Sequence, residues 1–405
     1  MKAVFAPSRP TGEVTAPPSK SIAHRYLIAA ALAEGVSHID GIAASEDVSA
    51  TIDCLRAIGA EITLDGSRAT VRGFDPRKSS PVSPLVCRES GSTLRFLLPL
   101  CWLSGEEFTL RGSARLLERP LSLYEEIAAA EGLTLTRADG AVTASGRLGG
   151  GEYTLRGNVS SQFITGLIFA LPFTARDSVL RLLPPVESRS YLDLTLDALA
   201  RFGGKADFID DVTVAIPAGT QLQAADLLVE GDHSNAAFFL ALKALGCPVT
   251  TLGILDDSRQ GDRVAGAHLL ALCEGYATIS LADCPDLGPI LMAVAAAKHG
   301  AHFTDTRRLR IKESDRGIAM AEELAKLGAH IKVEENDIYV EATPLHAPSE
   351  PLCGHNDHRI VMASATLLAL LGGSITGAEA VKKSLPEYFA IMQSLGTEVT
   401  LYENE

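Results

Sequence analysis

Six long apolar runs recur along the chain, and each directly follows a short polar cluster. The runs are 26–35, 96–105, 163–173, 236–246, 287–300 and 360–373. Apolar stretches of this length and spacing predict helices that are buried on most sides. The clusters in front of them contain Ser, Asp or Asn, which commonly cap helix N-termini. Six helices with polar N-terminal ends are therefore expected.

A second helical pattern follows most of these runs, and it usually ends in glycine and leads into a short alternating strand. Glycine is favoured just beyond a helix C-terminus because it adopts left-handed backbone angles freely. Strands are predicted, for example, at 60–64 and 329–333. The repeating unit is strand, helix, strand, helix, strand, strand, and six copies of it predict a repeated supersecondary structure.

The length of 405 residues is too great for one compact core and predicts two domains of three units each. Candidate crossings between the domains lie near 16–18 and near 230–232. The predicted organisation is an inserted domain, 18–230, and a discontinuous domain, 1–17 with 231–405. The fold class is α/β (α+β), with mixed sheets and helices packed inside them.

A formal net charge of −14 argues against a general binder of nucleic acid or membrane surfaces, because both partners are anionic. Lys and Arg nevertheless gather in the polar clusters, which predicts a local site for a small anion. No apolar run approaches the roughly 20 residues of a membrane span. Seven cysteines without a metal-ligand spacing, and an N-terminus unlike a signal peptide, predict reduced thiols in a cytoplasmic protein.

The first cluster contains Lys20, Ser21 and Arg25 at the start of a predicted helix. A helix N-terminus carries free N–H groups and partial positive charge, and Arg25 lies one turn beyond Ser21 on the same face. Together they suit a phosphate or a carboxylate. The alternative is a capping serine beside two solvated cations.

A second dense cluster places Lys312, Glu313 and Arg316 within one turn. An acid held between cations can protonate a substrate if its pKa is matched to that task. The other clusters, taken singly, can be read as helix caps. Their shared placement predicts instead a cleft lined by cations and a substrate with several negative charges. These cations are Lys20, Arg25, Arg119, Lys312, Arg316, Arg359 and Lys383.

Taken in order, the clusters make the chain resemble the 5-enolpyruvylshikimate-3-phosphate synthase family over essentially its whole length. The matching segments are Pro18–Ser21 with Arg25, Ser90–Arg95, Glu118–Pro120, Ser160–Gln162, Lys312–Arg316, Asn356–Arg359 and Lys383–Pro386. The resemblance implies two similar domains, each of three βαβαββ units arranged as an inverted, barrel-like prism with buried helices. It implies transfer of enolpyruvyl from phosphoenolpyruvate to the 5-hydroxyl of shikimate 3-phosphate, with release of phosphate.

The resemblance also implies the roles of individual residues. Asp286 would accept the hydroxyl proton, Glu313 would protonate the methylene carbon, and Lys20 and His358 would assist catalysis. Shikimate 3-phosphate would be held by Lys20, Ser21, Arg25, Ser160, Ser161, Gln162, Ser188, Tyr191, Asp286 and Lys312. Phosphoenolpyruvate would be held by Lys20, Gly91, Arg119, Gln162, Arg316, Arg359 and Lys383. The family further implies no metal and no cofactor, a cytoplasmic monomer, and competitive inhibition by glyphosate.

The chain departs from the common family pattern at a few positions. Arg88 and Glu89 stand where Gly-Asn is usual, Ser92 replaces a more usual Thr, and Arg308 stands where Asn often contacts substrate. Two alternatives remain: the sister transferase that acts on UDP-N-acetylglucosamine, and a catalytically silent phosphometabolite-binding protein of the same fold. The sister enzyme typically carries a reactive Cys in the loop that is 112–118 here, and this loop has none.

Overall fold

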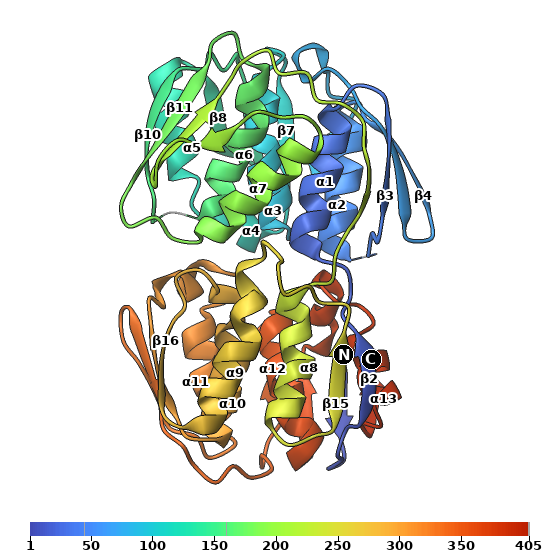
Figure 1. The fold of residues 1–405 in the computed structure, drawn as a ribbon, viewed down its shortest axis with the longest axis vertical. Coiled ribbons are helices and arrows are strands. Elements are labelled where there is room, and N and C mark those ends of the chain that lie inside the picture. The colour runs from blue at the N-terminus through green and yellow to red at the C-terminus, as the bar shows by residue number, and fades with distance from the viewer. Residues whose placement is uncertain (44, 159, 404–405) are drawn as a thin grey trace. The chain divides into compact units, whose positions relative to one another are not determined.

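Two compact units make up the computed structural model, which describes residues 1–43, 45–158 and 160–403. The inserted unit is Pro18–Glu230, and the discontinuous unit is Met1–Pro17 with Gly231–Glu405. Both combine helices with mixed sheets (Figure 1). The α/β fold class predicted from the sequence is confirmed.

Three four-stranded sheets belong to the inserted unit. The strands are β3 (Val36–Asp40), β4 (Glu61–Asp65), β5 (Arg68–Arg72), β6 (Leu85–Val86), β7 (Phe108–Arg111), β8 (Thr134–Ala138), β9 (Ala141–Ser145), β10 (Glu152–Arg156), β11 (Ser178–Leu183), β12 (Asp207–Phe208), β13 (Thr213–Ile216) and β14 (Asp226–Leu228). The sheet orders are β14-β3-β5-β4, β6-β7-β9-β8 and β10-β11-β13-β12. In each sheet the first two strands are parallel and the other pairs are antiparallel.

Seven α-helices accompany these sheets in the described part of the inserted unit. They are α1 (Lys20–Leu32), α2 (Glu46–Ile58), α3 (Gly91–Leu97), α4 (Ala114–Glu118), α5 (Ser122–Glu131), α6 (Ser161–Ala170) and α7 (Arg189–Arg201). The run β10, α6, β11, α7, β12, β13 follows the predicted βαβαββ order without interruption.

The discontinuous unit is built from the same kinds of element. Its strands are β1 (Lys2–Phe5), β2 (Gly12–Thr15), β15 (Val249–Leu252), β16 (Ala277–Ser280), β17 (Ala301–Thr304), β18 (Ile331–Val333), β19 (Asp337–Val340), β20 (Leu352–Cys353), β21 (Gly373–Thr376) and β22 (Val399–Tyr402). Its helices are α8 (His233–Ala244), α9 (Ala265–Glu274), α10 (Gly288–Ala297), α11 (Arg316–Ala325), α12 (His358–Leu371) and α13 (Tyr388–Ser394). The sheet orders are β15-β2, β16-β17-β19-β18 and β20-β21-β1-β22.

Strands from distant parts of the chain complete several repeats. The strand β1 lies between β21 and β22, and β2 pairs with β15. The first 17 residues therefore contribute one strand to each of two sheets of the discontinuous unit. In the inserted unit, β14 from the end of the segment pairs with β3 from its beginning. The uninterrupted repeat that the sequence predicts is therefore modified where the chain passes from one unit to the other.

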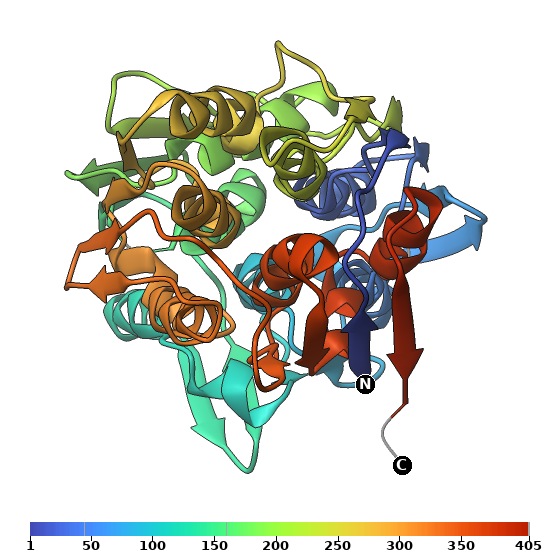
Figure 2. The ribbon, with the colours of Figure 1, turned by 90° about the horizontal axis from the view of Figure 1, so that it is seen from below.

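The first helix of each repeat forms the core. In α12, twelve of the 14 residues are buried, whereas α11 buries only six of its ten. The helices α8, α10 and α12 pack against one another, and Figure 2 shows helices nearly end-on with strands around the outside. A helix that is apolar all round must be enclosed, while an amphipathic one covers it with a single face.

Proline shortens two of the predicted core helices. The run 96–105 is α-helical only to Leu97 and continues as a 3₁₀ turn, Leu98–Trp102, that contains Pro99. In the same way α6 passes into a 3₁₀ turn, Leu171–Phe173, at Pro172. Proline has no N–H to donate to the preceding turn, so the α-helix cannot run on regularly through it.

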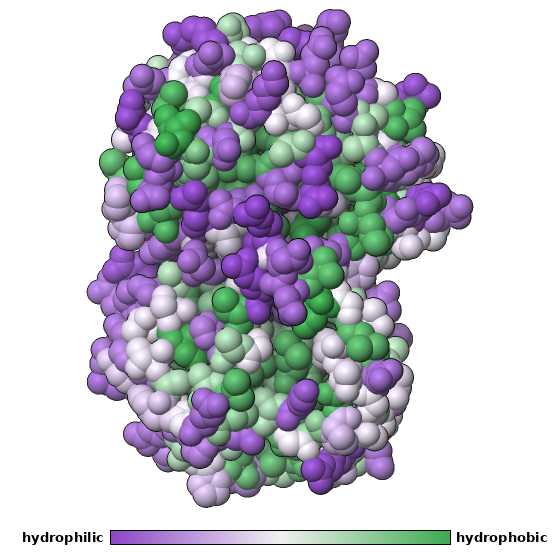
Figure 3. Space-filling model, in the orientation of Figure 1, coloured by the Kyte–Doolittle hydropathy of each residue, from purple (hydrophilic) through white to green (hydrophobic). Residues whose placement is uncertain are grey.

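Hydrophilic side chains cover much of the inserted unit on the face shown in Figure 3, while more apolar ones gather over α8 and α9 of the discontinuous unit. A hollow there is lined by residues that include Leu240, Leu269 and Leu270. No helix among the described residues combines the length and hydrophobicity needed to cross a membrane. All seven cysteines are free thiols, and five of them are buried.

Because the core helices are enclosed, a Leu→Ala substitution should lower the free energy of unfolding more in a core helix than in an outer helix of the discontinuous unit. Leu291 of α10 is fully buried, and Leu291→Ala should lower the free energy of unfolding of this unit by about 2–5 kcal/mol. Leu270 of α9 is 60% exposed, and Leu270→Ala should cost less than about 1 kcal/mol. Guanidinium unfolding followed by far-UV circular dichroism measures both. Equal losses would contradict the assignment of α10 to the core.

Candidate functional site

Helix α1 begins with two of the predicted site residues. Lys20 is its first residue, and its Nζ lies 3.0 Å from Asp47 Oδ2, near the start of α2. The Lys20 side chain is 16% exposed, so this ion pair is largely shielded from water. The carbonyl of Ser21 accepts a hydrogen bond from Arg25 Nη1 at 2.7 Å. Asp47 was not among the predicted site residues, although its position at a helix start in front of an apolar pattern offered the signal.

Arg25 is a buried cation held by uncharged acceptors. Its Nε donates to Thr195 Oγ1 at 2.9 Å and its Nη2 to the Tyr191 carbonyl at 3.0 Å. The guanidinium also lies over the rings of Phe96 and Tyr191, at 5.2 and 5.9 Å from their centroids. Burial lowers the pKa of Arg25 to about 10, so it stays protonated at neutral pH. No ion pair of Arg25 is found among the described residues, which leaves its charge available to an anion.

The segments Ser90–Arg95 and Ser160–Gln162 meet at Gly91. A Cβ added to Gly91 would lie 2.6 Å from Arg119 Nη1 and 3.4 Å from Gln162 Oε1. Gln162, at the start of α6, accepts from Arg95 Nη1 at 2.7 Å and donates to Ser92 Oγ at 3.0 Å. The amide of Gln162 is thus oriented by two partners from α3. The sequence did not assign a site role to Arg95, although it lies within the quoted Ser90–Arg95 motif.

Hydroxyl groups mark two further helix starts in the inserted unit. Ser160 caps α6, since its Oγ accepts from the Gln162 N–H at 3.4 Å, and Ser161 is the first residue of that helix. Ser188 is buried and precedes α7 with a left-handed backbone, φ 53°. Tyr191, in the first turn of α7, is half-buried against Arg25. These residues place polar groups at helix ends, where partial positive charge favours anions.

Arg316 organises the predicted residues of the discontinuous unit. Its side chain is 1% exposed and contacts three carboxylates: Nη1 lies 2.7 Å from Asp286 Oδ1, Nη2 2.7 Å from Glu313 Oε2, and Nε 2.8 Å from Asp357 Oδ2. Asp286 precedes α10, Glu313 precedes α11, and Asp357 caps α12. One guanidinium therefore ties together the N-terminal ends of three helices. Asp357 was quoted in a motif but not predicted as a site residue.

Two more cations surround Asp286. Lys312 Nζ lies 3.1 Å from Asp286 Oδ1, and Arg359 Nη2 lies 3.1 Å from Oδ2. Burial alone would raise the pKa of Asp286, but Arg359, Lys312 and Arg316 together lower it well below its usual value. The Nε and Nη1 of Arg359 are buried and have no hydrogen-bond partner among the described residues. Such donors are expected to face a ligand, because a buried donor without a partner is costly.

The remaining predicted residues lie on either side of this cluster. Lys383 is buried, and its Nζ donates to the Asn356 carbonyl at 2.6 Å. His358, the first residue of α12, is 2% exposed, and its Nδ1 lies 3.9 Å from Asp357 Oδ1. Lys383 ends a separate 3₁₀ segment, Ala378–Lys383, whereas His358 belongs to the helix start that also supplies Asp357 and Arg359.

Asp262 is an unpredicted acid in the same unit. Its Oδ2 accepts a hydrogen bond from Ser234 Oγ, and its Oδ1 is buried without a partner among the described residues. Burial, and then the negative charge of Asp286, raise the pKa of Asp262 to about 7. This carboxyl is therefore partly protonated at neutral pH. No cluster spacing pointed to it, since the short helical turn that carries it lies outside the repeated motifs.

The positions that depart from the family pattern are also accommodated locally. Arg88 has a left-handed backbone, φ 52°, and its Nη2 lies 2.8 Å from Asp53 Oδ2. Glu89 is half-buried, while Ser92 supplies the hydroxyl that accepts from Gln162. Arg308 is buried, and its charge contributes to lowering the pKa of Lys312, although burial is the larger cause.

Comparison with known proteins identifies a family to which the chain is similar. The family model described as EPSP synthase (3-phosphoshikimate 1-carboxyvinyltransferase) matches residues 4–280 and 271–392. A protein of Clostridium kluyveri named 3-phosphoshikimate 1-carboxyvinyltransferase is 37% identical, over 97% of each chain. One of the same name from Clostridium novyi is 36% identical, over 96% of each chain.

Solved structures show the same fold at lower identity. EPSP synthase from Acinetobacter baumannii aligns with a TM-score of 0.77 and 22% identity over 99% of each chain. The enolpyruvyl transferase NikO from Streptomyces tendae aligns with a TM-score of 0.74 and 15% identity over 98% of each chain. The sequence matches extend over nearly the whole chain at well above these identities, and the chain therefore belongs to the EPSP synthase family.

Proposed function

We propose that this protein transfers the enolpyruvyl group of phosphoenolpyruvate to the 5-hydroxyl of shikimate 3-phosphate and releases phosphate. The observation that carries the proposal is the cluster at Arg316, where an acid and a base share buried cations. Lys312, Arg316 and Arg359 lie within ion-pair distance of Asp286, and Arg316 also holds Glu313. An enolpyruvyl transfer needs a proton donor, a proton acceptor and positive charge for a carboxylate and a phosphate.

The proposed binding residues divide according to the substrate. Those proposed for shikimate 3-phosphate are Lys20, Ser21, Arg25, Ser160, Ser161, Gln162, Ser188, Tyr191, Asp286 and Lys312. Those proposed for phosphoenolpyruvate are Lys20, Gly91, Arg119, Gln162, Arg316, Arg359 and Lys383. Arg25 supports the first set because, among the described residues, its hydrogen bonds go to uncharged acceptors. Arg359 supports the second because two of its buried donors have no acceptor in the described part of the chain.

Glu313 is the proposed acid. Transfer of its proton to the methylene carbon of phosphoenolpyruvate would leave positive charge on the carbon that bears the phosphate oxygen. In the structure the Glu313 carboxylate lies 2.7 Å from Arg316 Nη2. The carboxylate of phosphoenolpyruvate would compete for the same guanidinium. A Glu313 side chain displaced from Arg316 would be able to reach the methylene carbon and serve as an acid.

Asp286 is the proposed base. As the 5-hydroxyl oxygen forms its bond to the positively charged carbon, the hydroxyl proton would pass to Asp286. The pKa of this carboxyl is low while three cations face it, which makes it a weak base before substrates bind. Anionic substrates that share Arg316, Arg359 and Lys312 would raise that pKa toward the range in which it accepts a proton.

Release of phosphate would complete the reaction. The carbon–oxygen bond to phosphate breaks while Glu313 takes a proton back from the methyl group, and the double bond is restored. Lys20, Arg119 and Lys383 would stabilise the departing phosphate or the carboxylate, and His358 would assist beside Asp357. Fixed cations of this kind lower the barrier because they need little reorganisation as charge develops.

We also propose that glyphosate is a competitive inhibitor and that the protein acts as a monomer. Glyphosate carries a phosphonate and a carboxylate, and therefore suits cations such as Arg359 and Lys383. Both proposals are independent of the assignment of acid and base.

The reaction is tested by a phosphate-release assay with phosphoenolpyruvate and one of two acceptors. Release is expected with shikimate 3-phosphate and not with UDP-N-acetylglucosamine. The reverse preference would support the sister transferase, and no release with either acceptor would support a silent binding protein. Omission of phosphoenolpyruvate serves as the control.

Replacing the proposed acid tests its role directly. Glu313→Gln removes the transferable proton while it keeps the size of the side chain, so turnover should fall by about 10²–10⁴-fold. Binding of shikimate 3-phosphate, measured by calorimetry, should change little. Turnover within threefold of that of the unaltered protein would contradict the assignment of Glu313 as the acid.

The close approach at Gly91 makes a second test. In Gly91→Ala the new methyl group would meet Arg119 Nη1 at 2.6 Å, so the guanidinium must shift. The KM for phosphoenolpyruvate should rise by roughly tenfold, which corresponds to about 1.4 kcal/mol, while the KM for shikimate 3-phosphate changes less. As a control, Gly66→Ala changes a glycine with open space around its Cβ position, although its φ of +58° adds some strain. Equal effects on both substrates would contradict a role of this contact in phosphoenolpyruvate binding.

A further inference from the structure

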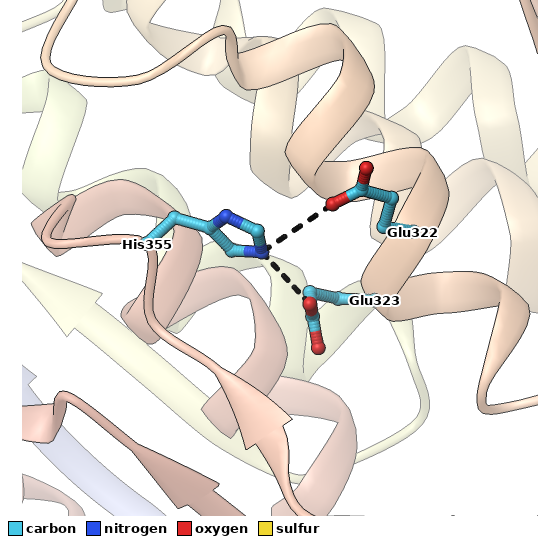
Figure 4. Close-up of side chains that lie close together, drawn as sticks. All are labelled: Glu322, Glu323 and His355. Atoms are coloured by element: carbon cyan, nitrogen blue, oxygen red, sulfur yellow. Dashed lines mark hydrogen bonds and ion pairs between the residues drawn. The ribbon is translucent and has the colours of Figure 1, made fainter.

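The last turn of α11, the helix that begins with Arg316, carries the buried acidic residue Glu323. Glu323 carries a carboxylate that is only 2% exposed, and its Oε1 lies 2.7 Å from His355 Nε2 (Figure 4). Glu322, the preceding residue, is 58% exposed, and its Oε2 lies 3.9 Å from the same nitrogen. A buried carboxylate is costly unless it is paired or hydrogen-bonded, so the contacts of Glu323 require an explanation.

The three side chains offer atoms of the kind that bind divalent cations, and they lie close together. The oxygens of Glu323 are, however, already used. Oε1 faces His355, and Oε2 accepts from Lys326 Nζ at 2.9 Å and from the Cys353 N–H at 2.8 Å. A metal ion would have to replace the His355 hydrogen bond and lie beside the Lys326 ammonium, a like charge. The contacts thus describe a hydrogen-bonded link between two segments.

The link fixes the segment that leads from β20 into α12. Glu323 contacts the backbone of Cys353 at its start and the ring of His355 two residues later. Between these contacts and α12, His355 and Asn356 both have positive φ, 48° and 52°. Residues other than glycine adopt such angles at a cost, and they keep them only where neighbouring contacts hold the backbone.

Two contacts of the candidate site begin in this turn. The Asn356 carbonyl accepts from Lys383 Nζ at 2.6 Å, and the next residue, Asp357, pairs with Arg316 Nε at 2.8 Å. Asp357 Oδ1 also accepts from the Arg359 N–H at 2.9 Å, which fixes the start of α12. A turn that relaxed from its left-handed conformation would move both the carbonyl and the carboxylate.

We propose that Glu323 and His355 are positioning residues, which hold the turn before α12 so that Lys383, Arg316 and Arg359 keep their places. The consequence for catalysis rests on the proposed function, in which these three cations bind phosphoenolpyruvate. Loss of the link should therefore weaken the binding of phosphoenolpyruvate more than the binding of shikimate 3-phosphate. Neither Glu323 nor His355 needs to touch a substrate.

The test compares the same substitution at adjacent residues. Glu323→Gln removes the charge of the link, and the KM for phosphoenolpyruvate should rise roughly tenfold while kcat falls less. Glu322→Gln, at the exposed neighbour, should leave both values within twofold. His355→Ala should resemble Glu323→Gln, and His355→Gln, which keeps an N–H donor, should recover most of the loss. A general loss of stability would affect both substrates alike and would not be rescued by the donor.

Amide hydrogen exchange supplies a readout that does not depend on activity. Exchange across 353–359 should accelerate in Glu323→Gln and in His355→Ala, and remain unchanged in Glu322→Gln. If Glu323→Gln fails to fold, His355→Ala carries the test, because His355 is 24% exposed and is cheaper to replace. Unchanged exchange together with an unchanged KM in His355→Ala overturns the proposal. Absence of phosphate release by the unaltered protein would instead overturn the proposed function and leave the exchange result decisive for the link.

Discussion

The pairing of the buried Arg316 guanidinium with three carboxylates is the constraint on which the discontinuous unit depends. Asp286, Glu313 and Asp357 come from the starts of three helices, and all three contact one planar cation. A guanidinium so deeply buried would be costly without such partners, and removing one partner of a buried pair typically costs about 3–5 kcal/mol. The acids in turn stay close together only because the cations offset their repulsion. The pKa of Asp286 lies well below its usual value for this reason, and that of Asp262, beside the same cluster, is raised.

This arrangement connects the architecture to the chemistry. Core helices that are apolar along their length must be enclosed, and their polar N-terminal ends are the parts that can meet a ligand. Partial positive charge at those ends favours anions, and the side chains of the clusters add full charges to it. In the inserted unit the starts of α3 and α6 bring Gly91 and Gln162 together, beside Arg119 at the end of α4. Arg95 and Ser92 orient the amide of Gln162. Family membership and local geometry therefore support the same type of substrate, a small molecule with several negative charges.

The buried carboxylate of Glu323 illustrates how the fold would hold the proposed site. Glu323 is buried at the far end of α11 from Arg316, yet it contacts the turn that presents Asn356 and Asp357. The backbone of that turn is strained, because His355 and Asn356 have positive φ. Such strain persists only where several neighbouring contacts hold the backbone in place. The two ends of α11 thus act on the same segment, one through Arg316 and the other through Glu323.

The fold class, the repeated helices and the motif residues follow from the sequence, because helix periodicity, capping residues and ordered motifs are local properties. The sequence does not show where the α-helices stop in the runs 96–105 and 163–173, since each run predicts one helix despite its proline. The pairing of β1 with both β21 and β22 comes from the tertiary structure, because strand pairing depends on residues far apart in the chain. The contacts made by Asp47, Asp262, Arg95 and Glu323 also came from the structure. Their roles depend on burial and on which charges face them, and neither quantity is encoded in the spacing of residues along one segment.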